Sequence, residues 1–97
     1  MAKGGWTYIL TNKPHGVLYI GVTADLPRRL DQHLRGEGPS FARRYNLQIL
    51  VLCEHHATIE EAIAREKTHK AWKRAWKVEL IERCNPNWED VAQSLLA

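Results

Sequence analysis

Two short hydrophobic runs near the N-terminus, residues 6–10 and 18–21, predict β-strands. Side chains alternate across a strand, so Tyr8 shares a face of the first run with the residues two positions away, and Tyr19 does the same in the second. The polar link at residues 11–16 contains a proline and a glycine, which are typical of turns. We therefore expect an antiparallel hairpin that brings the two phenols together.

A helical pattern follows the hairpin, because leucine recurs at every fourth position from residue 26 to residue 34. A threonine or an aspartate within residues 23–25 can cap this helix, and the glycines at residues 36–38 should end it. Helix geometry places Arg29 and His33 four residues apart on one flank, beside the leucine stripe.

The rest of the chain predicts one more strand and several helices. Residues 47–52 are apolar almost throughout, as expected of a strand that is covered on both faces or lies centrally in a small sheet. Residues 40–45 predict one helical turn, and a capping box at residue 58 starts a helix that runs to about Ala75. From residue 78 onward, a short helix, a break at residues 85–87 and a final turn or helix should pack over the sheet.

Together these elements predict an α/β fold of the α+β kind, a three-stranded antiparallel sheet flanked by helices. We expect a single domain over residues 1–97, in which residues 1–5 form a flexible lead. A chain of 97 residues has room for one core but not for a separate recognition domain. Any choice of target must then be made by the one domain.

Glu66 stands out in the predicted helix from residue 58, because it lies in line with the apolar positions Ile59 and Ala62. Burying an unpaired carboxylate is costly, so Glu66 needs a cation, a hydrogen-bonding partner or an opening in the fold. The same face continues with basic residues, which are Lys70, Lys73 and Lys77. An ordinary i, i+4 pair with Lys70 is the simpler explanation for the carboxylate.

The distribution of charge says more than the net charge of +3 and the sequence pI of about 9.1. Residues 65–77 hold six cations and one anion, whereas anions outnumber cations in residues 80–97. A cluster of this kind indicates a phosphate-facing patch. The candidate nucleic-acid-binding residues are Arg28, Arg43, Arg44, Lys70, Lys73, Arg74 and Lys77.

The cysteines and the apolar runs bear on the compartment. Cys53 and Cys84 form no disulfide-rich pattern, which indicates reduced thiols in a cytoplasm. The longest apolar run, residues 49–53, is far too short to span a bilayer, and the N-terminus lacks the apolar run of a signal peptide. We therefore expect a cytoplasmic protein without a membrane partner.

Two triplets in the hairpin, Thr-Tyr-Ile at residues 7–9 and Tyr-Ile-Gly at residues 19–21, resemble the signature of the GIY-YIG nuclease family. After the second triplet, Arg29 and His33 match the family's arginine and the His or Tyr four residues later. Glu66, followed by basic residues, resembles the family's metal-binding glutamate. The closing stretch is similar to small, stand-alone, single-domain bacterial members, so the resemblance covers roughly the whole chain.

The resemblance implies a role for each candidate catalytic residue. Glu66 would hold a single Mg²⁺ ion, with Mn²⁺ as an alternative, and Arg29 would contact the scissile phosphate. Tyr19 would be the general base or position the water, with Tyr8 as the alternative, and His33 would orient the phosphate or a tyrosine. Asn85 would support the site by hydrogen bonding. The implied catalytic set is Tyr8, Tyr19, Arg29, His33 and Glu66.

Two departures from the family pattern accompany the resemblance. Thr7 stands where the family name has Gly, a substitution that keeps the neighbouring tyrosine. Val22 follows the second triplet where the excision-repair relatives carry a lysine nearby. If that lysine assists the base in those relatives, this chain must use another cation or manage without one.

The expected function is a metal-dependent DNA endonuclease that acts in DNA repair or recombination. The alternative is a non-catalytic nucleic-acid-binding module of the same fold, and a third class is an interaction adaptor that uses a tryptophan surface. Taken singly, strand tyrosines and the pair Trp72 and Trp76 are ordinary core residues. The DNA could be branched, single-stranded or duplex, bound by a monomer or weak dimer, with a possible partner protein for targeting.

Overall fold

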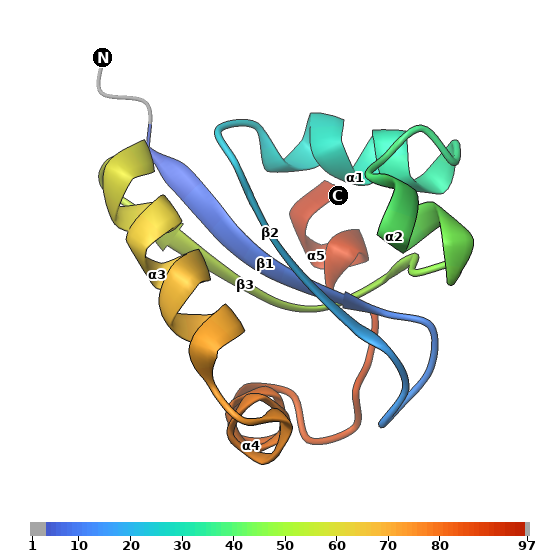
Figure 1. Cartoon of the computed structure of the whole chain (residues 1–97). Helices are drawn as coiled ribbons and strands as arrows, with labels where there is room; N and C mark the ends of the chain where they lie inside the picture. The colour runs from blue at the N-terminus through green and yellow to red at the C-terminus, as the bar shows by residue number, and fades with distance from the viewer. Residues whose placement is uncertain (1–3, 97) are drawn as a thin grey trace.

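Three strands form the centre of the molecule. The computed structural model describes residues 4–96, without the side chains of residues 95 and 96. Strands β1 (Gly5–Thr11), β2 (Leu18–Thr23) and β3 (Ile49–His56) form one antiparallel sheet in the order β2-β1-β3 (Figure 1). The three-stranded antiparallel sheet predicted from the sequence is confirmed.

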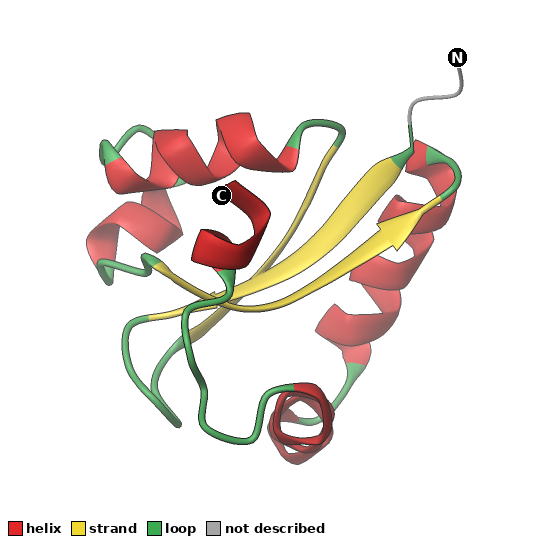
Figure 2. Ribbon diagram, turned by 180° about the vertical axis from the view of Figure 1, so that it is seen from behind, coloured by secondary structure: helices red, strands yellow, loops and turns green. Residues whose placement is uncertain are grey.

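Helices cover both faces of this sheet. One face carries α1 (Leu26–Leu34), α2 (Ser40–Arg44) and α5 (Ala92–Leu96), whereas α3 (Ile59–Ala71) and α4 (Arg74–Cys84) lie on the other (Figures 1 and 2). Two cores result. The first contains Tyr8, Leu10, Leu26, Leu30, Ala42, Leu47 and Leu50, and the second contains Ile9, Ile20, Val51, Leu52, Ile81 and Trp88.

Of the two explanations offered for the apolar sequence of β3, covering on both faces agrees with the structure and a central place in the sheet does not, because β3 is an edge strand; it begins two residues later than expected. It reads as continuously apolar because helices cover it on both faces, and a register shift opposite Ile9 and Leu10 places Val51 and Leu52 together in the second core. The C-terminal segment covers its outer edge, where the Val91 N–H donates to the Leu50 carbonyl at 2.8 Å. The C-terminal segment thereby gives the outer edge of β3 a backbone hydrogen-bond partner.

The helix expected from residue 58 to about Ala75 is in fact two helices. Thr58 caps α3 as predicted, its hydroxyl accepting from the Glu61 N–H at 3.2 Å, but the helix ends at Ala71. Trp72 and Lys73 then adopt extended backbone angles before α4 begins. The predicted continuous face from Glu66 through Lys77 is therefore wrong, because Lys73 belongs to the break and Lys77 to a second helix.

The start of the first strand differs slightly from the prediction. β1 begins at Gly5, which is buried, one residue before the expected start of order. The remainder of the predicted flexible lead, residues 1–3, lies outside the described residues. Among residues 4–96, no helix is long and apolar enough to cross a membrane.

Candidate active site at the β2 edge

The two signature tyrosines meet on one face of the sheet, as the alternation of side chains predicts. In the register between β1 and β2, Tyr8 lies opposite Gly21 and Leu10 lies opposite Tyr19. Tyr8 and Tyr19 are therefore diagonal neighbours, a spacing that aromatic side chains bridge. Their ring centroids are 6.2 Å apart.

Gly21 makes room for the first of these rings. A Cβ atom at this position would lie against Cζ and the hydroxyl oxygen of Tyr8, far closer than van der Waals contact. Because glycine leaves that space open, the Tyr8 ring extends over β2 toward the edge of the sheet. The last residue of the second triplet thus sets the position of the tyrosine in the first.

Helix α1 brings His33 and Arg29 to the same place. Its start is fixed by Asp25, whose side chain accepts from the Arg28 N–H at 3.2 Å. One turn after Arg29, the buried His33 places its Nε2 atom 3.1 Å from the Tyr8 hydroxyl oxygen. The ring centroid of His33 is 6.0 Å from that of Tyr19. Three rings from three elements therefore pack around one point.

Burial dominates the electrostatics of Tyr8, which is completely inaccessible to solvent. It raises the pKa of this phenol to about 12, with smaller contributions in the same direction from Tyr19 and Glu66. A hydrogen bond and the positive charge from Arg29 lower the pKa, but they do not offset the burial. Tyr8 is accordingly a neutral phenol at neutral pH.

The pKa of His33 is shifted in the opposite direction to that of Tyr8. Burial lowers its pKa from the ordinary 6.5, and the neighbouring Arg29 charge lowers the pKa further. The imidazole is therefore neutral at neutral pH, so one ring nitrogen carries a proton and the other is free to accept one. The Tyr8–His33 contact is a hydrogen bond between two neutral groups.

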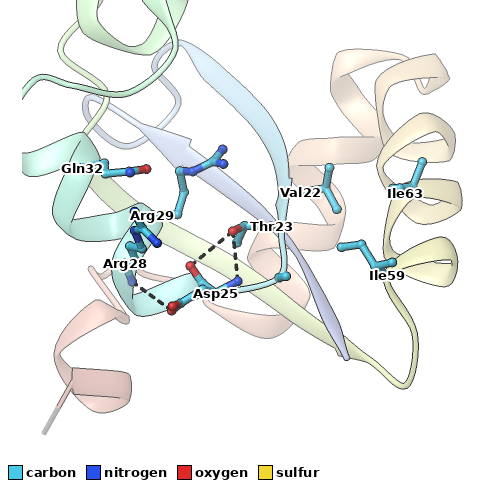
Figure 3. A pocket seen from close by; sticks show the side chains of 9 residues that line it. Val22, Thr23, Asp25, Arg28, Arg29, Gln32, Ile59 and Ile63 are labelled. Atoms are coloured by element: carbon cyan, nitrogen blue, oxygen red, sulfur yellow. Dashed lines mark hydrogen bonds between the residues drawn. The ribbon is translucent and has the colours of Figure 1, made fainter. Parts of the chain in front are cut away.

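Arg29 extends from α1 toward β2, into a cavity between α1 and the start of α3 (Figure 3). The cavity has a volume of about 470 Å³, and Arg28 and Ile63 also line it. Arg29 is half-buried and Arg28 is exposed. A planar guanidinium in such a cleft suits a phosphate, because its fork of N–H groups matches two phosphate oxygens.

Glu66 lies on the stripe of α3 that faces this side of the molecule, since Ile63, Glu66 and Lys70 are three and four residues apart. Its carboxylate is 16% exposed and lies 3.3 Å from Lys70 Nζ. Its ion-pair partner Lys70 lines a cavity together with Tyr19, which places Glu66 beside the tyrosine cluster, and its negative charge contributes to the raised pKa of Tyr8. Glu66 thus joins the four predicted partners from the opposite side of the β2 edge.

The donor set suits only a metal with few protein ligands. Within residues 4–96, no group of three or more His, Cys, Asp or Glu side chains could hold an ion. The half-buried carboxylate beside the tyrosine cluster is that of Glu66, and Mg²⁺ is commonly held by one or two carboxylates together with water and substrate phosphate oxygens. The residues present therefore fit Mg²⁺ completed by substrate, and they do not form a closed cage.

The predicted nucleic-acid-binding residues divide into two groups. Lys70 and Lys77 line a cavity of about 230 Å³ together with Tyr19, because the turn between α3 and α4 returns Lys77 to the β2 edge. Four more of the predicted residues are exposed on α1, on α2 and at the break between α3 and α4, and they are Arg28, Arg43, Arg44 and Lys73.

Arg74 and Asn85 have structural partners instead. The Arg74 guanidinium donates to the carbonyls of His15 and Gly16 at 2.9 and 2.6 Å, which ties the hairpin loop to α4. The buried Asn85 amide donates to the Val51 and Glu89 carbonyls at 3.1 and 2.8 Å. Neither side chain is directed at the tyrosine cluster, so the expectation that Asn85 hydrogen-bonds in the site does not match its contacts.

Phe41 is a neighbour of the site that was not among the predicted residues. Its ring lies at 6.3 Å from that of Tyr19 with an interplanar angle of 28°, and it lines the same cavity as Lys70. The signal available in the sequence was the interleaving of aromatic and basic residues over positions 41–45. Nothing in that pattern indicated that the segment would lie against β2.

Comparison with known proteins agrees with this geometry. Residues 4–79 match the profile of the GIY-YIG catalytic domain, and no solved structure gave a significant match. A UPF0213 protein of Pseudomonas aeruginosa is 33% identical over 76 residues, which are 78% of this chain and 73% of the relative.

Two further UPF0213 proteins are similar to this chain. One, from Orgyia pseudotsugata multicapsid polyhedrosis virus, is 33% identical over 79 residues, covering 79% of this chain and 76% of the relative. Another, from Staphylococcus aureus, is 34% identical over 67 residues, covering 69% and 82%. With its signature tyrosines, Arg29 and Glu66 gathered at one sheet edge, this chain belongs to the GIY-YIG family, whose members are typically nucleases.

Proposed function

We propose that this protein is a divalent-metal-dependent DNA endonuclease whose active site lies at the β2 edge. The observation that carries the proposal is the convergence of Tyr8, Tyr19 and His33 with Arg29 on one side and Glu66 on the other. Phosphodiester hydrolysis needs these functions: a group beside the attacking water, positive charge at the phosphate and an anchor for a metal ion. Separate elements of the fold supply each of them.

Tyr19 is the phenol assigned to the water. It is half-buried and lines the cavity that contains Lys70 and Lys77, so a water molecule and a phosphate can approach it. Tyr8 is fully buried, its pKa is raised to about 12, and its hydroxyl is already bonded to His33. We therefore assign Tyr8 and His33 to holding the tyrosine cluster in place, and Tyr19, in its phenolate form, to accepting a proton from the attacking water.

Arg29 is assigned to the scissile phosphate, which its cavity and half-buried position favour. The water oxygen forms a bond to phosphorus as the bond from phosphorus to the 3′ oxygen breaks, leaving a 5′-phosphate and a 3′-hydroxyl. The leaving oxygen takes its proton from solvent. When bound at Glu66, a divalent ion supplies positive charge at the phosphate and the leaving oxygen.

The test is cleavage of end-labelled single-stranded, duplex and branched DNA in Mg²⁺, in Mn²⁺ and in EDTA. We expect metal-dependent products from the wild type, and their loss in Glu66→Gln and Arg29→Ala. Glu60→Gln and Arg35→Ala are matched controls, because both residues are exposed on or beside the same two helices. They should keep wild-type cleavage.

Two results would contradict the proposal. Cleavage that survives Glu66→Gln at full rate would mean that the activity arises from another site or from a contaminant. Salt-sensitive DNA binding without cleavage of any substrate in either metal would identify a nucleic-acid-binding module of this fold.

A further inference from the structure

Two aromatic side chains beside the candidate active site remain open to solvent. Phe41 is 46% exposed and Tyr45 is 42% exposed, and their ring centroids are 4.9 Å apart. They are four residues apart, so they share one side of α2, whereas Ala42 is the residue that this helix buries. The chain therefore presents two exposed aromatic rings, inclined to each other by 48°, that its own core does not use.

This surface is continuous with the catalytic cluster. Phe41 is stacked on Tyr19, and Tyr19 packs against His33, so the rings form a row that leads from the buried site to the solvent. Phe41 lines the cavity that holds Tyr19, and it also lines a second cavity, of about 340 Å³, with Tyr45. A group bound on Phe41 would lie next to anything bound at Tyr19.

Cations surround the same surface. The Arg44 guanidinium carbon lies over the Tyr45 ring at 5.8 Å from its centroid, and Lys70 and Lys77 line the cavity on the other side of Phe41. Lys70 is paired with Glu66, whereas Lys77 is half-buried at the cavity wall. Aromatic faces flanked by cations are the combination that binds single-stranded nucleic acid, because bases stack on the rings while phosphates meet the cations.

We propose that Phe41 and Tyr45 form a stacking platform for an unpaired base of the DNA strand that enters the active site. This inference rests on the proposed function and gives it a substrate class, which is DNA with unpaired nucleotides at the cleavage position. Bases inside a duplex keep both faces covered by their neighbours, so only an unpaired base has a face free for Phe41.

A second exposed aromatic surface offers an internal control. Trp76 is 53% exposed and packs against Trp72, but it lies on the flank of the molecule where Arg65 covers the Trp72 ring and bonds Glu54 of β3. The nearby Arg83 is paired with Glu79 at 3.1 Å. This surface is equally aromatic but has no contact with Tyr19, so it should not take part in stacking.

The test is a comparison of binding constants in a Glu66→Gln parent, so that cleavage does not interfere. Fluorescence anisotropy would measure the affinity of the protein for a short labelled single strand and for a blunt duplex of the same sequence, both at one salt concentration. Phe41→Leu keeps an apolar side chain of similar size without a π face, and Phe41→Trp enlarges the π face. Trp76→Leu is the matched control, and thermal unfolding checks that all variants remain folded.

We expect Phe41→Leu to weaken single-strand binding by roughly 10- to 100-fold, the value of one stacked base, with much less effect on the duplex. Phe41→Trp should restore the single-strand affinity, and Trp76→Leu should match the parent. Equal weakening for both DNAs, no weakening at all, or a parent that binds no DNA would overturn the proposal. If the surface instead docks a protein or a second copy, Phe41→Leu will leave DNA binding unchanged.

The two proposals fail in different ways. If the wild type cuts nothing, the nuclease proposal fails, while the ratio of single-strand to duplex affinity still decides the stacking proposal. If cleavage occurs but Phe41→Leu changes the affinities for single-stranded and duplex DNA by the same factor, only the stacking proposal fails.

Discussion

The Tyr8 hydroxyl oxygen lies 3.1 Å from Nε2 of His33, a buried hydrogen bond that joins the central strand to α1. Both groups are held neutral by burial, which raises the pKa of Tyr8 to about 12 and lowers the pKa of His33. This bond leaves Tyr19 as the phenol of the cluster that a water in the adjoining cavity can approach. The two signature tyrosines therefore have different parts in the site.

That division predicts an order of effects for the two hydroxyl deletions. Tyr19→Phe should lower the DNA cleavage rate by ~10²- to 10⁴-fold, the usual contribution of a group that handles the proton of the nucleophile. Tyr8→Phe should cost ~0.5–1.5 kcal/mol of stability, the net value of a buried hydrogen bond, and about tenfold in rate or less. Single-turnover cleavage and urea unfolding measure the two quantities, and the reverse order would exchange the assignments.

Gly21 is predicted to be irreplaceable for a steric reason. Gly21→Ala puts a Cβ against the Tyr8 ring, so the ring must move, and we expect a loss of about 1–3 kcal/mol in unfolding free energy together with most of the activity. Gly36 is the comparison, since it has a φ of 73° but no atom within 4 Å of the place where a Cβ would lie. Gly36→Ala should cost ~1–2 kcal/mol of backbone strain while the folded protein cleaves normally.

Local patterns in the sequence are sufficient to predict the strands and the face of the sheet that carries the candidate site. The alternation around Tyr8 and Tyr19 fixes which side chains meet, because the period of a strand is two. The edge position of β3 could not be predicted in the same way. An apolar run such as residues 49–53 shows that both faces are covered, but it does not show how many strands lie beside it.

The break between α3 and α4 could not be predicted for a comparable reason. The segment around Trp72 and Lys73 contains no glycine or proline, and its residues are compatible with a helix. At the break, Trp72 packs against His69 and lies under the Arg65 guanidinium, three and seven residues earlier in the chain. Residues 69 and 65 would also face Trp72 in a continuous helix, so these contacts do not predict the break, and the position of Lys77 beside Tyr19 follows from the break itself.

Asn85 should matter for stability and not for catalysis. Its amide donates to the Val51 and Glu89 carbonyls, and its oxygen accepts from the Glu89 N–H at 3.0 Å. Asn85→Asp replaces the donor with a charged acceptor facing two carbonyls, and we expect a loss of ~3 kcal/mol or more. Urea unfolding measures the loss, and cleavage per folded molecule at low temperature should be unchanged. A rate defect in fully folded Asn85→Asp would return this residue to the active site.

Two cations near the start of α4 are predicted to act differently. Lys77 lines the cavity with Tyr19, so Lys77→Ala should weaken DNA binding and reduce the slope of log affinity against log salt by about one. Arg74 is bonded to the hairpin loop, so Arg74→Ala should instead lower the unfolding free energy by ~1 kcal/mol. Anisotropy titrations at several salt concentrations separate the two. A salt slope reduced by Arg74→Ala alone would show that the loop contact is given up when DNA binds.

Stability should fall as the solution becomes mildly acidic, because two buried histidines resist protonation in the folded state. His69 is 1% exposed, and both its ring nitrogens lack a hydrogen-bond partner among the described residues, although Nε2 lies 3.7 Å from the Glu54 carboxylate, which raises the pKa of His69 by less than burial lowers it. Burial is the main cause that lowers its pKa, and burial likewise lowers the pKa of His33.

The unfolded chain takes up these protons near the ordinary pKa of 6.5, whereas the folded protein does so only at lower pH. Their stabilisation is therefore complete above that pH and is lost as the pH falls through the lowered pKa values. His69→Leu should flatten the dependence of unfolding free energy on pH. Urea titrations across this range measure the slopes, and an unaltered slope in His69→Leu would show that His69 is not one of the groups responsible.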